Sequence, residues 1–196
     1  MQVNNLIYLT DDIIYLKNKK RTKIISQKIN KNIIKYGKIY NQEKFIKTYD
    51  NLLKTNHLNN NIFGDTIKVI INDTYTPADI KYLKSTLEKF NYRKILFEKE
   101  TKKYKLNTQN AYLNVLTNYS ILSYIDEYKK TKSYLIPDDF FPSLKDFLSY
   151  IKKIIAEREL FLIGHGEKIS EILNEFEKTY QNKTYIYTNS ATFIIN

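Results

Sequence analysis

Short apolar runs separated by polar turns make up the first part of the chain, a pattern typical of β-strands. Two of these runs, within residues 6–16, flank the polar sequence Thr-Asp-Asp and predict a β-hairpin. A basic turn follows at residues 17–21, and residues 22–29 predict a third strand. The chain is therefore expected to begin with β-structure.

Helical spacing of apolar residues replaces this pattern after Asn41, which is a suitable N-cap for a first helix. A strand at residues 66–72 comes next, and Thr76, followed by proline, marks the start of a second helix that runs to about residue 90. Residues 93–97 predict another strand. A strand, a helix and a strand in this order predict a parallel βαβ unit.

The C-terminal half returns to β-structure at residues 111–125, where two apolar runs flank a polar pair and predict a second hairpin. The remaining segments are, in order, a linker containing Pro137 and Pro142, a helix at about 143–158, a strand at 160–163, a helix at about 168–180, and strands at 184–188 and 192–195. Strands and helices that mix in this way predict an α/β fold.

The composition limits the class of protein. Hydrophobic residues make up 42% of the 196 residues, enough for a packed interior. There is no cysteine, which excludes disulfide scaffolds, thiolate zinc sites and cysteine nucleophiles. The longest apolar runs, such as residues 160–163, are much shorter than the roughly 20 residues that a membrane-spanning helix needs. No signal peptide is recognisable, so a cytoplasmic protein is expected.

The formal net charge of +11 is compatible with binding to nucleic acid or to an anionic membrane. However, only three of the 32 basic residues are arginine, the preferred side chain for phosphate and base contacts. Lysine, asparagine, isoleucine and tyrosine, which A/T-rich codons encode, are frequent throughout, with 18 tyrosines in all. We therefore interpret much of the charge as genome composition and regard nucleic acid as the less favoured partner.

Common catalytic motifs are absent. The two histidines lie in unrelated contexts, and the sequence has neither a P-loop nor a serine nucleophile elbow. Pairs of aspartates occur at predicted turns, where this residue is favoured for its own backbone hydrogen bonding. A magnesium-dependent nuclease would require Asp11, Asp73 and Asp138 to converge, and this alternative stays open.

The most specific local signal is Gly164-His165-Gly166, which follows the strand at residues 160–163 and precedes a helix. Two of the four glycines of the chain lie here. Glycines at such a junction permit a tight turn and a close approach of the backbone to a ligand at the helix N-terminus. A plain strand-to-helix turn explains the same residues.

The order of these elements resembles the actin-like ATPase superfamily, in particular its PilM-, FtsA- and GspL-like members. Residues 7–13 resemble the first phosphate-contacting hairpin of that family, residues 111–120 the second, and residues 161–173 its adenosine turn. The resemblance implies an actin-like (RNase H-type) α/β fold of mixed sheets with flanking helices, in two small lobes at residues 1–110 and 111–196. The nucleotide-contacting positions that it implies are Thr10, Asp11, Asp12, Asn114, Thr117, Ser120, Gly164 and Gly166.

Several family residues are replaced at these positions. In the first hairpin the family's Asp falls on Tyr8 and its Gly on Thr10, and in the second its Asp falls on Asn114 and its Gly on Leu116. A leucine obstructs the close approach to phosphate that glycine permits. The missing carboxylates are those expected to organise magnesium and water. ATP hydrolysis is therefore not expected.

The resemblance then implies a non-catalytic scaffold that binds a protein or peptide partner in a membrane-associated assembly of the pilus, secretion or division type. Such a scaffold needs no cofactor, lies at the inner face of the membrane, accepts a peptide of a membrane protein, and is open to self-association. Three alternatives remain. They are an active ATPase that binds ATP and magnesium through Asp11 or Asp12, a nucleic-acid-binding protein or nuclease on an RNase H-type core, and an unrelated α/β domain.

Overall fold

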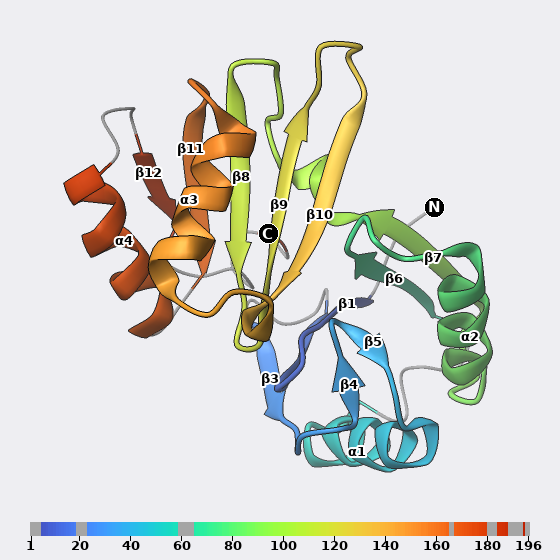
Figure 1. Cartoon of the computed structure of the whole chain (residues 1–196). Helices are drawn as coiled ribbons and strands as arrows, with labels where there is room; N and C mark the ends of the chain where they lie inside the picture. The colour runs from blue at the N-terminus through green and yellow to red at the C-terminus, as the bar shows by residue number, and fades with distance from the viewer. Residues whose placement is uncertain are drawn as a thin grey trace. The chain divides into compact units, whose positions relative to one another are not determined.

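The computed structural model describes residues 5–18, 23–58, 65–164, 167–179, 184–187 and Ile194. Contacts within the chain divide it into two units, Met1–Glu100 with Ile194–Asn196 and Thr101–Phe193. Each unit contains a five-stranded sheet (Figure 1) and has its own apolar core.

The sheet of the first unit is mixed and has the strand order β3-β2-β1-β6-β7. β1, β2 and β3 are antiparallel, whereas β6 pairs in parallel with both β1 and β7. These pairings confirm the N-terminal hairpin, the third strand and the parallel βαβ unit. The elements are β1 (Asn5–Leu9), β2 (Ile13–Asn18), β3 (Ile25–Lys28), β4 (Ile34–Lys35), β5 (Lys38–Ile39), α1 (Gln42–Thr55), β6 (Thr66–Ile71), α2 (Pro77–Glu88) and β7 (Lys94–Lys99).

Local hydrogen bonds explain where the two helices of this unit begin. The Asn41 side chain accepts a hydrogen bond from the Lys44 backbone N–H at 3.0 Å, which makes it the N-cap of α1. Thr76 and Asp79 form a reciprocal capping box at the start of α2, with Pro77 in the first helical position. Both predicted helix starts are confirmed.

Alternate positions of the strands supply the core of the first unit. Ile7 and Leu9 of β1 point to the same face and pack in one cluster with Phe45 and Leu52 of α1 and Leu83 of α2. Burial of each of these side chains contributes roughly 1.5–3 kcal/mol before entropy is counted. The cluster therefore holds both helices against the sheet.

The sheet of the second unit has the order β10-β9-β8-β11-β12. β10, β9 and β8 are antiparallel, whereas β11 pairs in parallel with both β8 and β12. This is the same relative order as in the first unit. The antiparallel pairing of β8 and β9 confirms the second hairpin. The elements that follow β7 are η2 (Glu100–Lys103), β8 (Asn110–Val115), β9 (Tyr119–Ile125), β10 (Thr131–Pro137), η3 (Asp138–Phe140), α3 (Leu144–Ile155), β11 (Glu159–Gly164), α4 (Glu167–Thr179) and β12 (Thr184–Tyr187).

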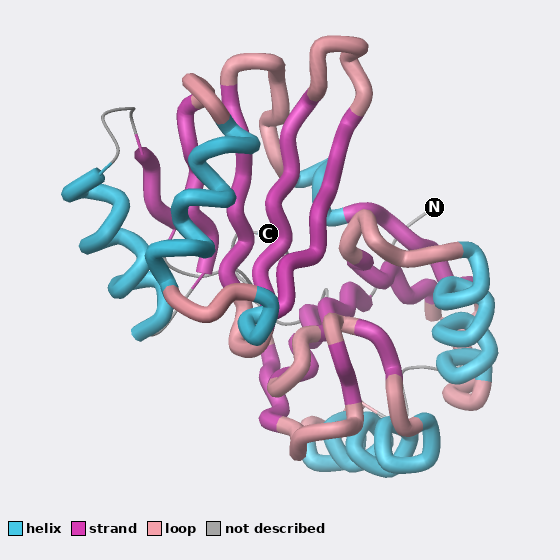
Figure 2. Tube along the Cα trace, viewed as in Figure 1, coloured by secondary structure: helices cyan, strands magenta, loops and turns pink. Residues whose placement is uncertain are grey.

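Two helices cover one face of this second sheet (Figure 2). Ile151 of α3 and Ile172 of α4 belong to one buried cluster with Leu113 of β8 and Leu162 of β11. All four side chains are inaccessible to solvent. The apolar spacing that predicted the two helices therefore corresponds to the faces that they bury.

The strand β10 and the hairpin β4–β5 were not predicted. The expected linker is wrong for residues 131–137, which form β10 and pair with β9 along the whole strand. Its sequence lacks a clear alternation because β10 lies at the edge of the sheet and most of its residues are exposed or half-buried. The small hairpin β4–β5 was missed because each of its strands has only two residues.

The terminal strand expected at residues 192–195 lies outside the described residues, apart from Ile194. Across the part of the chain that the structure describes, no helix is both long enough and apolar enough to span a bilayer.

Candidate functional site

The turn between β1 and β2 contains three of the predicted nucleotide-contacting residues. The Thr10 N–H donates to the Ile13 carbonyl at 3.0 Å, and the Ile13 N–H donates to the Thr10 hydroxyl at 3.1 Å. The same hydroxyl lies within 3.1 Å of the Asp12 carboxylate and 3.0 Å of the Ile13 carbonyl. The polar groups of Thr10 are thus used within the turn itself.

Asp11 links this turn to the β4–β5 hairpin. Its Oδ1 atom accepts a hydrogen bond from the Gly37 backbone N–H at 3.0 Å, and the residue is 6% exposed. Gly37 has a φ of 73°, in the left-handed region that favours glycine. The carboxylate that sequence analysis offered as a substitute catalytic acid therefore holds two turns together.

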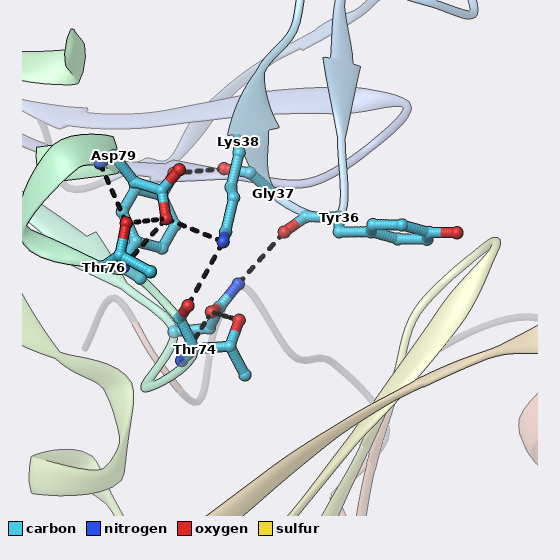
Figure 3. Close-up of polar contacts among 8 residues, drawn as sticks. Tyr36, Gly37, Lys38, Thr74, Thr76 and Asp79 are labelled. Atoms are coloured by element: carbon cyan, nitrogen blue, oxygen red, sulfur yellow. Dashed lines mark hydrogen bonds and ion pairs between the residues drawn. The ribbon is translucent and has the colours of Figure 1, made fainter.

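The β4–β5 turn is also attached to the loop that follows β6 (Figure 3). The Asn72 side-chain amide donates to the Tyr36 carbonyl at 3.1 Å, and the Tyr75 hydroxyl donates to the Gly37 carbonyl. Burial raises the pKa of Tyr75 far above its ordinary value, so its hydroxyl remains a donor. The Tyr36 ring points away from these contacts (Figure 3).

Lys38 joins the same hairpin to the start of α2. Its Nζ atom donates to the Asp79 carboxylate at 2.8 Å and to the Thr74 carbonyl at 3.2 Å (Figure 3). Burial acts to raise the pKa of Asp79, but the hydrogen bonds from Lys38 and Thr76 outweigh it and lower that pKa. Asp79 therefore serves both the capping box and this ion pair.

Tyr8, which stands where the family resemblance places an Asp, is buried in the first unit. Its hydroxyl donates to the Glu100 Oε2 atom at 3.3 Å, and its ring stacks on Tyr15 with a centroid separation of 6.2 Å. Burial, together with the negative charge of Asp12, raises the pKa of Tyr15 to about 12. Tyr8 is therefore part of a buried group of side chains.

The turn between β8 and β9 is also closed by its own backbone. The Leu116 N–H donates to the Tyr119 carbonyl at 2.9 Å, and the Leu116 side chain is 3% exposed. Asn114 and Ser120 are fully buried, whereas Thr117 is exposed. The Ser120 hydroxyl has no hydrogen-bond partner among the described residues. Only Thr117 of these three predicted site residues faces solvent.

Lys168 of α4 holds this turn from outside. Its Nζ atom donates to the Leu116 carbonyl at 2.8 Å and to the Asp138 carboxylate. The Asp138 N–H in turn donates to the Asn118 carbonyl at 3.1 Å. Burial lowers the pKa of Lys168, and the charge of Asp138 opposes that change. The β8–β9 turn is therefore clamped between α4 and the segment that follows β10.

Gly164 ends β11 beside Val115 of the parallel neighbour β8. A Cβ atom on Gly164 would lie 2.8 Å from the Val115 carbonyl oxygen and 3.1 Å from the Ile169 side chain. Glycine is thus required here by the packing of β11 against β8 and α4. Gly166, the other glycine of the predicted adenosine turn, lies outside the described residues.

Comparison with known proteins identifies the fold. No protein-family model matches the chain, and no curated protein matches its sequence. Among solved structures, the ethanolamine utilization protein EutJ of Carboxydothermus hydrogenoformans is 9% identical, with 99% of this chain and 88% of that one covered and a TM-score of 0.70. MreB5 of Spiroplasma citri bound to AMPPNP is 9% identical, with 100% and 95% covered and a TM-score of 0.63. This chain has the actin-like ATPase fold.

A third structure, a Bacteroides thetaiotaomicron protein described as having an actin-like ATPase fold and unknown function, is 13% identical. The match covers 95% of this chain and 92% of that protein, with a TM-score of 0.55. These likenesses confirm the expected actin-like mixed sheets with flanking helices. At such low identities they establish the fold alone, and the roles of the predicted site residues stay predictions.

Within the actin-like fold, the structure places Thr10, Asp11 and Asp12 together in one turn of the first unit. In the second unit, Asn114 and Ser120 lie on the paired strands β8 and β9. The described residues contain no group of three or more histidine, aspartate or glutamate side chains placed to hold a metal ion. The carboxylate cluster that the nuclease alternative requires is therefore not found in that part of the chain.

The two lysines that hold these turns, Lys38 and Lys168, were not predicted from the sequence. Neither lies in a recognisable motif, because each acts on a carbonyl far away in the sequence: Lys38 on Thr74 and Lys168 on Leu116. Gly37, whose N–H donates to Asp11, was not predicted as a site residue either. Its rarity, as one of four glycines, was the available signal.

Proposed function

We propose that this chain is a non-catalytic actin-like scaffold that binds a protein or peptide partner in a membrane-associated assembly of the pilus, secretion or division type. One observation carries the proposal. In both turns that the resemblance assigns to phosphate, polar groups are already bound within the chain. Asp11 accepts from Gly37, and the Leu116 carbonyl accepts from Lys168.

The backbone donors of these turns support the same interpretation. A phosphate-binding turn presents free N–H groups and small side chains to the anion. Here the Thr10 N–H donates to Ile13 and the Leu116 N–H donates to Tyr119, while the Leu116 side chain is bulky. Binding of a nucleotide phosphate at these donors would require both turns to open.

Exposed aromatic side chains favour a protein partner. Tyr40 is 69% exposed, Tyr128 is 74% exposed and Phe140 is 66% exposed. Tyrosine and phenylalanine are enriched in the centres of protein interfaces, where they bury a large area at a small cost in side-chain entropy. The net charge of +11 would add attraction to an anionic membrane surface.

The first experiment separates a scaffold from an ATPase. Phosphate release and calorimetric binding are measured with ATP and magnesium for the wild type, for Asp11→Asn and for the exposed control Asp139→Asn. We expect no release above buffer and no heat of binding for any of the three proteins. Asp11→Asn is expected to fold, because the amide oxygen still accepts from Gly37. Magnesium-dependent hydrolysis that Asp11→Asn abolishes and Asp139→Asn retains would establish an active ATPase instead.

The second experiment addresses the partner. The tagged chain is used to capture proteins from its native lysate, and each candidate is purified and mixed with the chain in size-exclusion chromatography with light scattering. We expect a defined complex that survives nuclease treatment and the removal of nucleotide. Capture of nucleic acid alone would favour the nucleic-acid-binding alternative. The same light-scattering measurement gives the state of self-association.

A further inference from the structure

The last strand at one edge of the first sheet, β3, has β2 on one side and no strand on the other among those described. Lys28 lies opposite Ile13, and the neighbouring Ile29 N–H donates to the Asp12 carbonyl at 2.8 Å. Hydrogen-bonded and non-hydrogen-bonded pairs alternate in an antiparallel ladder. The backbone groups of Lys28 therefore point away from β2, toward the open edge.

A side chain of the same strand occupies one of these outward groups. The Gln27 amide donates to the Lys28 carbonyl at 2.9 Å in an exposed hydrogen bond. The Gln27 side chain thus supplies the hydrogen bond that the backbone N–H of a neighbouring strand would otherwise donate to the Lys28 carbonyl. It exchanges readily for a main-chain donor, because exposed hydrogen bonds contribute little net stability.

A cavity of about 380 Å³ lies between α1 and the C-terminal end of this edge strand with the loop after it (residues 27–30). Lys28 lines it from the strand side, Ile33 is a buried apolar part of its wall, and Lys47, Thr48 and Asn51 line it from one face of α1. An open strand edge beside a helix is the geometry in which extended peptides add to a sheet. The strand supplies main-chain pairing, and the helix supplies side-chain contacts.

The charge of the groove indicates the kind of occupant. Lys28 and Lys47 are exposed, and neither forms an ion pair with a carboxylate of the described residues. No arginine and no aromatic side chain lines the cavity. It therefore lacks the guanidinium groups that bind phosphates and the aromatic rings on which bases stack. A second copy of this chain would bring its own Lys28 to the same edge, where like charges repel.

We infer that the groove between β3 and α1, which we call the β3 groove, binds an acidic, extended segment of a protein partner. This inference rests on the proposed scaffold function and assigns its peptide site. The segment adds to the sheet as a strand beside β3, where it replaces the Gln27 amide at the Lys28 carbonyl. Acidic side chains on the face of the segment toward α1 then lie within reach of Lys47.

The test uses the full chain and a random-peptide display library, followed by fluorescence anisotropy with the enriched peptides in synthetic form. Three variants are compared with the wild type. Lys28→Pro removes an outward N–H without removing a bond to β2. Lys47→Glu reverses the charge on the helix side. Lys81→Glu makes the same charge change at an exposed position of α2 that does not line the groove.

We expect enriched peptides in which acidic residues alternate with β-branched or aromatic ones. Lys28→Pro and Lys47→Glu should each weaken their binding by about tenfold or more, while Lys81→Glu should leave it within about twofold, because main-chain pairing and local charge act only in the groove. Thermal unfolding verifies that each variant is folded, and Lys47→Glu alone suffices if Lys28→Pro does not fold.

Failure to enrich acidic peptides, or equal binding to wild type and both groove variants, would overturn the inference. So would oligonucleotide binding that Lys47→Glu abolishes, or a dimer that Lys28→Pro dissociates in light scattering. These results are distinguishable from failure of the proposed function. Hydrolysis of ATP would refute the scaffold, whereas a purified partner that binds both groove variants normally would place the scaffold's site on another surface.

Discussion

The close packing of its neighbours explains why a glycine stands at position 164. β11 and β8 run in parallel with Gly164 beside Val115, and Ile169 of α4 packs against the same point. A Cβ atom there would lie 2.8 Å from the Val115 carbonyl oxygen. Carbon and oxygen atoms that are not bonded to each other do not pack so closely, so the backbone would have to move. The glycine therefore has a structural cause within the second unit.

Gly164→Ala is expected to lower the free energy of unfolding by about 1–3 kcal/mol, because the new methyl group overpacks a site formed by backbone. Urea denaturation measures the change. Ser149→Ala, at an exposed position of α3, serves as the control and should stay within about 0.5 kcal/mol of the wild type. Wild-type stability in Gly164→Ala would contradict a packing role and return the glycine to the ligand-binding interpretation.

Single residues were predictable from the sequence where their partners are close in the chain. Asn41 and Thr76 were recognised as helix N-caps because each bonds to a backbone group three residues later. Asp11 and Lys168 were not assigned their contacts, because their partners lie 26 and 52 residues away. Only the folded sheet brings such groups together, and no local pattern encodes the pairing.

At the scale of elements, a single carboxylate fastens the β4–β5 hairpin to α2. Asp79 lies in the first turn of α2, where the helix dipole favours a negative charge, and it also accepts from Lys38 of β5. Its folded-state pKa is therefore below the ordinary value. A group with a lowered pKa stabilises the fold when it is charged, and this stabilisation disappears as the pH falls through the folded-state pKa.

Asp79→Asn is expected to flatten the pH dependence of stability on the acid side. Between about pH 5 and pH 3, the free energy of unfolding should fall further in the wild type than in the variant. The difference should be about 1 kcal/mol or less, since the pair is partly exposed. Thermal unfolding at a series of pH values measures it. Lys38→Met removes the partner and should flatten the profile in the same direction. An unchanged acid slope in both variants would show that the pair contributes nothing.

Exposure hides the pattern of β10, the longest strand that escaped prediction. β10 was expected to be a linker because most of its residues are exposed or half-buried and form no clear apolar face. Its pairing with β9 comes from a turn in which the Asp126 carboxylate accepts the N–H groups of Tyr128 and Lys130. The buried strands and amphipathic helices, by contrast, were predicted within a few residues of their observed bounds.

At the scale of the whole chain, the same strand order occurs twice. In each unit, three antiparallel strands are followed by two strands that pair in parallel on the other side of the first strand. The two predicted hairpins were the visible part of this repetition. The fold class was predictable because it depends on the order of strands and helices, which periodicity reveals. The bonding of the turns depends on three-dimensional proximity, which periodicity does not reveal.

The net charge of +11 is also a property of the whole chain, and we expect any affinity for nucleic acid to behave accordingly. Anisotropy with fluorescent oligo-dT should show weak binding that falls by about tenfold or more between about 50 and 200 mM salt, because counterion release drives it. Lys47→Glu should change it by about twofold or less. Binding that persists at high salt or depends on one lysine would reveal a specific nucleic-acid site.

The Lys168 clamp has a consequence for any attempt to engineer the β8–β9 turn. Replacement of Leu116 by glycine would remove a bulky side chain, yet the carbonyl at that position would still be held by Lys168, which Asp138 holds in turn. A turn engineered to bind phosphate would therefore also need a substitution at Lys168 or Asp138. The side chain at position 116 and the ion pair that holds its carbonyl are two separate obstacles, and the removal of one leaves the other in place.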